Sequence, residues 1–184
     1  MPYLRANTDA AFGFAPYDGV KRISQYSKLS STAAIFAGDV VLLNSSGQVQ
    51  SAATITDRAI VGVAAESIAS GSTTTCMVYD DPDQLFVAQD DSVGTALAQT
   101  HIGNQFSITG FTPGTAAQVT RNRSIMQVDT STAAAGTEGT LNQAVMVVGL
   151  HPIESGFPSA ASNPRKVIVR FNPAYHIFAT SSGV

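Results

Sequence analysis

Apolar residues come in short runs that turn residues separate. Residues 40–43 form one run and residues 60–65 a longer one. Asn44-Ser-Ser-Gly47 has the composition of a hairpin turn and joins the first run to residues 48–51, which are expected to return along it. Gly38 and Gly47 stand where the backbone needs a positive φ. This pattern predicts a hairpin followed by a buried strand.

The same pattern continues along the chain. Further strands are expected at residues 73–79, 84–89, 105–108, 123–129, 143–150 and 166–171. Residues 92–99 have helical spacing over a turn or two, and residues 133–135 are expected to form a loop. Many short strands with Gly and Pro turns predict an all-β fold, a β-barrel or β-sandwich of the β-tulip or jelly-roll kind. No clear internal repeat is visible, although residues 145–149 resemble residues 60–63.

The chain divides into three predicted parts. Residues 1–34 carry aromatic side chains without strand or helix periodicity, which predicts an extended arm on its own domain or on a neighbouring subunit. Residues 35–172 are the predicted β-domain, in which residues 109–165 are either a subdomain or insertions. Residues 173–184 form a predicted tail, which contacts either its own domain or a partner.

Charge is sparse in the 184 residues. Asp, Glu, Lys and Arg make up 12% and the net charge is −3, whereas soluble proteins typically have about 25% charged residues. Lys and Arg are scattered, while nucleic-acid-binding proteins gather them on one face. No apolar run approaches the ~20 residues of a membrane span, and the first residues lack a secretory signal. We therefore expect neither a nucleic-acid partner nor a membrane.

The residues that carry most enzyme chemistry form no recognisable motif. A single cysteine, Cys76, excludes an internal disulfide and is expected to be buried and inert. His101, His151 and His176 are expected to be surface or loop residues, because none has ligand-like spacing to another ligand type. Hydrolase elbows and phosphate-binding loops are also missing. The sequence predicts a protein that is not an enzyme and has no cofactor, metal or catalytic residue.

Asp80-Asp-Pro-Asp83 is the best candidate for a cation site, since calcium prefers several carboxylate oxygens. The spacing does not match an EF-hand. Asp-Pro-Asp is also a common turn in which carboxylates accept hydrogen bonds from backbone amides. The turn is the favoured interpretation.

Four short segments carry a resemblance to a known family. Gly38-Asp-Val-Val41, Ser46-Gly47 and Ile60-Val-Gly-Val-Ala64 followed by Ser70-Gly71 resemble the capsid decoration (cement) proteins of tailed bacteriophages. The match covers about a fifth of the chain. The resemblance implies a β-module, made in the host cytoplasm, that binds the exterior of an icosahedral capsid. Its implied partners are the major capsid protein and further copies of itself, with a trimer favoured.

Such a protein needs exposed anchors that seat in pockets of a partner. The predicted anchors are the aromatic residues of the two chain ends: Tyr3, Phe12, Phe14, Tyr17, Tyr175 and Phe178. Two alternatives stay open. A receptor- or glycan-binding fibre or spike module would place its site in a loop such as 80–83 or 110–114. A β-barrel enzyme would place His101 or His151 beside a carboxylate in a cleft.

Overall fold

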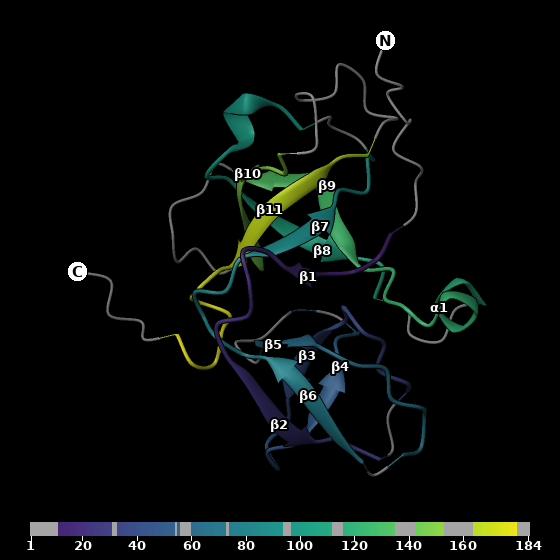
Figure 1. Cartoon of the computed structure of the whole chain (residues 1–184). Helices are drawn as coiled ribbons and strands as arrows, with labels where there is room; N and C mark the ends of the chain where they lie inside the picture. Colours follow the sequence, from purple (N-terminus) through teal and green to yellow (C-terminus); the bar gives the residue numbers. More distant parts are fainter. Residues whose placement is uncertain are drawn as a thin grey trace.

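Short antiparallel strands make up most of the chain. The computed structural model describes residues 11–30, 33–53, 55, 60–72, 74–93, 97–111, 116–134, 143–152 and 164–179. Among them are two sheets, the α-helix α1 (Ala116–Arg121) and the 3-10 helix η1 (Gln99–His101). The all-β prediction is confirmed. In Figure 1 the larger sheet occupies the upper half of the molecule and the smaller sheet the lower half.

Each sheet has a defined strand order. The six-stranded sheet runs β1 (Ala15–Pro16), β7 (Phe86–Gln89), β11 (Lys166–Phe171), β10 (Val145–Leu150), β8 (Gln105–Thr109) and β9 (Gln127–Ala134). The five-stranded sheet runs β2 (Ile23–Ser27), β6 (Thr75–Tyr79), β5 (Ile60–Ala64), β3 (Val40–Leu43) and β4 (Val49–Ser51). All strand pairs within both sheets are antiparallel.

One apolar core lies between and within the sheets. Val40, Ile60 and Val63 of the smaller sheet share it with residues of the larger sheet such as Phe86 and Val145. A second core fills the smaller sheet on its other side and contains Val41, Val61 and Cys76, among others. Two packed antiparallel sheets are consistent with a β-sandwich, and the strand ladders of the described residues form no closed barrel, since only isolated bridges join β2 to β4 and β7 to β9.

The two sheets repeat one topology. If β1 is set aside, the larger sheet has the order β7-β11-β10-β8-β9, and the smaller has β2-β6-β5-β3-β4. If the five strands of each set are numbered in chain order, both sheets have the spatial order 1-5-4-2-3. An isolated parallel bridge then links the end of the first strand to the third in each sheet: Lys28 with Val49, and Asp90 with Val128.

The strand registers agree residue by residue. Tyr26 pairs with Cys76 in the smaller sheet, as Ala88 pairs with Val167 in the larger one. Leu43 pairs with Val49, as Ile108 pairs with Val128. Val40 pairs with Val63, as Gln105 pairs with Met146. The described residues therefore form two five-stranded units of equal topology, with the strands of residues 23–80 matched to those of residues 85–171.

This repeat corrects the expectation drawn from the sequence. Lys28 N donates a hydrogen bond to Thr74 O, and Asp90 N donates the corresponding bond to Arg165 O. Lys28 therefore matches Asp90, and Thr74 matches Arg165. The loops between matched strands thus differ in length, so no fixed period exists in the sequence. The likeness of residues 145–149 to residues 60–63 falls on the matched strands β10 and β5, but not in the structural register, in which Val63 matches Met146.

Most predicted strands are confirmed to within a few residues, and Gly38 and Gly47 have the predicted positive φ of 92° and 73°. Three local predictions are wrong. Residues 133–134 end a strand, residues 97–98 are not helical, and residues 15–16 and 23–27 form strands. β1 pairs with β7 and β2 with β6, so this part of the predicted arm lies on its own domain.

Candidate interaction surface

The predicted aromatic anchors differ widely in exposure. Tyr3 lies outside the described residues. Phe14 and Tyr175 are only 2% and 3% exposed, Phe12 and Tyr17 are half-buried, and Phe178 is 42% exposed. Exposure therefore separates core residues from residues that a partner could contact.

Phe14 and Tyr175 are core residues, which corrects their assignment as anchors. The Phe14 ring lies 5.9 Å from that of Phe171, and both belong to the main core. Tyr175 accepts a backbone hydrogen bond from Ile60 at 3.0 Å, and Ile177 donates one to Ile60 at 2.9 Å. The tail up to these residues is packed on its own domain, so neither ring is available to another protein.

Phe12 and Tyr17 lie beside polar groups at the edge of the larger sheet. The Nζ atom of Lys166 lies 5.8 Å from the centre of the Phe12 ring. The Tyr17 ring packs edge-on against His151, with 5.8 Å between the ring centres. Both rings are thus fixed from one side and only partly accessible from the other.

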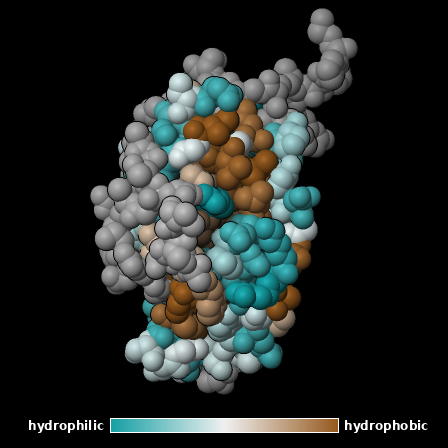
Figure 2. All heavy atoms as spheres, turned by 90° about the vertical axis from the view of Figure 1, so that its left-hand side faces the viewer, coloured by the Kyte–Doolittle hydropathy of each residue, from teal (hydrophilic) through white to brown (hydrophobic). Residues whose placement is uncertain are grey.

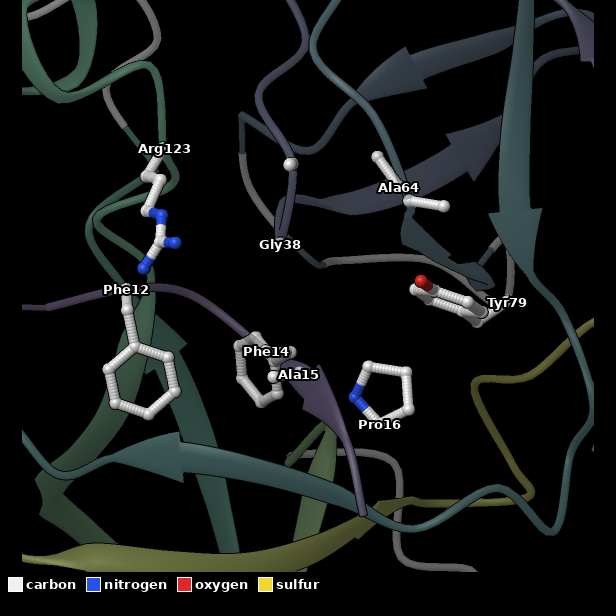
Figure 3. A pocket seen from close by; sticks show the side chains of 10 residues that line it. Phe12, Phe14, Ala15, Pro16, Gly38, Ala64, Tyr79 and Arg123 are labelled. Atoms are coloured by element: carbon white, nitrogen blue, oxygen red, sulfur yellow. The ribbon is translucent and has the colours of Figure 1, made fainter. Parts of the chain in front are cut away.

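Phe12 also lines a small pocket. The pocket has a volume of about 220 Å³ and lies where the N-terminal segment crosses between the two units (Figure 3). Its lining is mostly apolar, with Arg123 and the Tyr79 hydroxyl as polar groups: Phe12, Phe14, Ala15, Pro16, Ala37, Gly38, Ala64, Ala65, Tyr79 and Arg123. Ligand sites for drug-sized molecules are typically larger, about 300–1,000 Å³. The pocket has room for one side chain of a partner.

Phe178 is held at the surface by a chain of polar contacts. The Arg22 guanidinium lies over the Phe178 ring, 5.2 Å from its centre. Arg22 Nε donates to Asp80 Oδ1 at 2.8 Å and Nη2 donates to the Asp80 carbonyl at 2.7 Å. The Tyr26 hydroxyl donates to Asp80 Oδ2 at 2.6 Å. The cation–π contact holds the Phe178 ring against Arg22, and the two charge-assisted hydrogen bonds hold Arg22 on Asp80.

The electrostatics of this cluster keep Asp80 ionised. Burial alone would raise the pKa of the Asp80 carboxyl, but the hydrogen bonds from Tyr26 and Arg22 outweigh burial and lower it. Burial, followed by the hydrogen bond to Asp80, raises the pKa of Tyr26. Asp80 is 2% exposed and Arg22 is accessible, so the carboxylate is buried while the guanidinium that it binds lies at the surface.

Further apolar side chains are exposed in the two segments that carry Arg22 and Phe178. Val20 is 51% exposed, Ile23 is 42% exposed and Ile177 is 41% exposed. We call the set of Arg22, Ile177 and Phe178 the Arg22 surface. The described C-terminal segment lies on the left of Figure 1, and this side faces the viewer in Figure 2. On this face apolar atoms gather in an upper and a lower area (Figure 2).

The other sequence candidates are used structurally. Asp81 Oδ1 accepts a hydrogen bond from Asp83 N at 2.8 Å, and Asp80 is engaged by Arg22 and Tyr26, which fits the turn interpretation of this segment. Within the described part of the chain no group of three or more His, Cys, Asp or Glu side chains could hold a metal ion. Cys76 is buried, and burial raises the pKa of its thiol to about 12.

The histidines have three different environments. His101 Nδ1 accepts a hydrogen bond from Ala98 N at 3.0 Å at the start of η1, and His151 is half-buried against Tyr17. His176, predicted as a surface or loop residue, lies in the irregular tail but is buried, with 4% of its surface exposed. Burial lowers its pKa to about 4, so the ring is neutral near pH 7. Its Nδ1 accepts a hydrogen bond from Phe178 N at 3.2 Å.

Sequence reasoning missed Arg22, Tyr26 and Asp80 as one cluster. Arg22 and Asp80 are 58 residues apart, and only the pairing of β2 with β6 brings them together. The adjacent Lys21-Arg22 pair and the Asp-Pro-Asp turn were each visible, but their contact was not.

No family model and no curated protein matches the chain. Of the helices in the described residues, none has the length and apolar character to cross a membrane.

Proposed function

We propose that the protein is a virion structural protein that binds the outside of an icosahedral phage capsid and stabilises the shell. Two lines of reasoning support this proposal. The turn-and-strand segments near Gly38 and Ile60 resemble capsid decoration proteins, and the structure offers a rigid surface suited to contact another protein. The proposed partner is the major capsid protein.

The observation that carries the proposal is the fixed and exposed ring of Phe178. Interface anchors are typically aromatic side chains that are already held in their bound geometry, because a fixed side chain loses little conformational entropy on binding. Phe178 is 42% exposed while Arg22 and the buried Asp80 hold it from the protein side. Ile177, the residue before it, adds exposed apolar area.

Stabilisation of the shell follows from mass action. A protein that binds the assembled shell and not the free subunits shifts the equilibrium toward the shell. The two packed β-units supply a rigid body for such binding, and the Arg22 surface supplies the contacts. Of the predicted anchors, Phe178 is therefore retained as the principal one, with Phe12 and Tyr17 as secondary contacts.

The test is co-sedimentation of the full-length protein with undecorated shells of the major capsid protein from the same virus. We expect saturable binding by the wild type and at least about tenfold weaker binding by Phe178→Ser, which corresponds to about 1.4 kcal/mol. Val119→Ser is the matched control, because Val119 is 62% exposed on α1. It is expected to bind like the wild type.

Absence of co-sedimentation by the folded wild type would contradict the proposal. The receptor- or glycan-binding alternative is then tested with the same protein on a glycan array. Equal weakening by Phe178→Ser and Val119→Ser would also count against a specific Arg22 surface.

A further inference from the structure

We infer that the free edge of β2 pairs with β2 of a second copy of this chain, antiparallel and about a twofold axis. The inference does not depend on the proposed capsid function. The two units that share a topology differ at the outer side of their first strand.

In the larger unit the first strand has a neighbour on its outer side. β1 pairs with β7 through Ala15 with Val87 and Pro16 with Phe86, and Tyr17 N donates to Leu85 O at 2.8 Å. In the smaller unit the first strand is β2, and it is the terminal strand of its sheet. No described residue pairs with the outer side of Ile23–Ser27. The residues that match Leu85 and Val87 are Ile23 and Gln25.

The direction of the free backbone groups follows from neighbouring hydrogen bonds. Lys28 N donates inward to Thr74 O of the segment leading to β6, whereas Leu29 N donates outward to Val49 O. Backbone groups alternate in direction along a strand paired antiparallel, so those of Ile23, Gln25 and Ser27 point outward like those of Leu29. Unpaired edge groups of this kind are a template for pairing with another chain.

The edge lacks the features that protect edge strands. Proteins usually guard an open edge with charged residues, proline or a bulge. Residues 23–27 read Ile-Ser-Gln-Tyr-Ser, without charge or proline, and the register with β6 shows no bulge. Ile23, Gln25 and Ser27 are exposed. The flanking cations do not block the edge, since Lys28 is 1% exposed and Arg22 is bound to Asp80.

A second copy fits this edge because the free segment is self-complementary. With Gln25 at the centre, antiparallel pairing places Gln25 opposite Gln25 of the second copy and Ile23 opposite Ser27. All of these residues carry outward backbone groups, so each can exchange hydrogen bonds with its partner. A twofold arrangement of this type uses the same patch on both subunits, which is the commonest symmetry of soluble oligomers.

The experiment measures the mass of the full-length protein by light scattering over a concentration range of about 1–200 µM. The expected mass for the wild type is twice the chain's 19.1 kDa. Gln25→Lys puts two like charges at the twofold axis and is expected to weaken the dimer at least about tenfold. Gln25→Pro removes the outward N–H and leaves the backbone hydrogen bonds to β6 in place, although it also removes the side-chain hydrogen bond to Thr75 on β6, and the same loss is expected.

Thr75→Lys is the matched control. Thr75 lies on β6, accepts a hydrogen bond from the Gln25 side chain at 2.7 Å and is exposed. This variant therefore adds the same charge and removes the same side-chain contact one strand away from the edge, and it is expected to stay dimeric. Circular dichroism of each variant reports that it is folded.

The remaining outcomes overturn the inference. A monomeric wild type means that a second copy does not occupy the edge. A dimer or a trimer whose mass is unchanged by Gln25→Lys and Gln25→Pro forms through another surface. A trimer that these variants dissociate excludes the twofold arrangement, because pairing of two β2 strands joins only two copies.

Discussion

Gly38 and Gly103 occupy the same position in two copies of one turn. Gly38 N donates to Ala64 O at 2.9 Å, and Gly103 N donates to Val147 O at 2.8 Å. Their φ angles are 92° and 86°. The next residue in each turn also makes the matching hydrogen bond, from Asp39 N to Phe36 O and from Asn104 N to His101 O. Each turn therefore starts the second strand of its unit with the same backbone geometry.

The two glycines nevertheless differ in their surroundings, which gives a first prediction. A Cβ atom on Gly38 would lie 2.9 Å from the Phe12 carbonyl oxygen, whereas one on Gly103 would meet nothing within 4 Å. Gly103→Ala is expected to lower the free energy of unfolding by about 1–2 kcal/mol through its positive φ alone. Gly38→Ala adds a backbone clash and is expected to cost about 3 kcal/mol or more. Urea unfolding of both variants measures the difference.

Equal costs for the two variants would contradict this account. They would show that the N-terminal segment does not lie against the Gly38 turn as described. Gly47→Ala serves as a further reference, because Gly47 also has a positive φ and open space around it.

A second prediction separates core from anchor among the aromatic residues. Phe14→Ala is expected to lower the free energy of unfolding by about 3–5 kcal/mol, because the buried ring leaves a cavity. Phe178→Ala is expected to cost less than about 1 kcal/mol, because the ring is exposed. Urea unfolding measures both. A large loss of stability in Phe178→Ala would assign this residue to the fold and not to an interface.

The position of Phe14 also bears on truncation. Removal of residues 1–34 deletes β1, β2 and Phe14, which contribute to both sheets and to the main core. The truncated chain is expected to be unstable, so loss of partner binding by it would not identify an anchor. Single substitutions such as Phe178→Ser are the sharper test.

How far the sequence predicts this fold depends on the local signal. Both ends of the strand Lys166–Phe171 were predicted correctly, because Val167, Ile168 and Val169 form a β-branched run that favours a strand by itself. β2 was missed, since Ile-Ser-Gln-Tyr-Ser has few apolar residues and owes its conformation to pairing with β6. β1 has two residues, and only its partner β7 defines it.

The candidate surface was predictable only in part. Aromatic residues in irregular segments give no periodicity, so the sequence cannot separate the buried Phe14 and Tyr175 from the exposed Phe178. Burial of these rings depends on contacts with Phe171 and Ile60, which are distant in sequence. The repeat was not visible in the sequence for a related reason. Lys28 and Asp90, like Gly38 and Gly103, occupy matching positions in the two units, but the residues around them in the sequence differ in type.

A third prediction concerns the Asp80 carboxylate. Asp80→Asn is expected to lower the free energy of unfolding by about 2 kcal/mol at pH 7, because the buried carboxylate accepts from Arg22 and Tyr26. The pKa of Asp80 is lower in the folded state, so its contribution is present above the unfolded pKa of about 3.9 and is lost as the pH falls through the folded value. Urea unfolding at pH 7 and below pH ~3 measures the change.

Asp83→Asn is the control for this prediction, since Asp83 lies in the same turn and is exposed. Its effect is expected to stay below about 0.5 kcal/mol. A stability difference between the wild type and Asp80→Asn that is the same at low and neutral pH would contradict a role for the charge.

The last prediction concerns His176, which lies in the tail between Phe171 and Phe178. Burial lowers the pKa of this ring to about 4 from an ordinary 6.5. Between these values the unfolded chain binds a proton that the folded chain does not, so stability falls as the pH decreases, by at most about 1.4 kcal/mol per pH unit from this group. His176→Gln removes the titrating group, and its stability is expected to depend less steeply on pH between 6.5 and 4. Urea unfolding across this interval measures the slopes, and the NMR titration of the ring measures the pKa itself. A titration midpoint near 6.5 would place His176 in solvent and would mean that the tail does not pack against Ile60 as described.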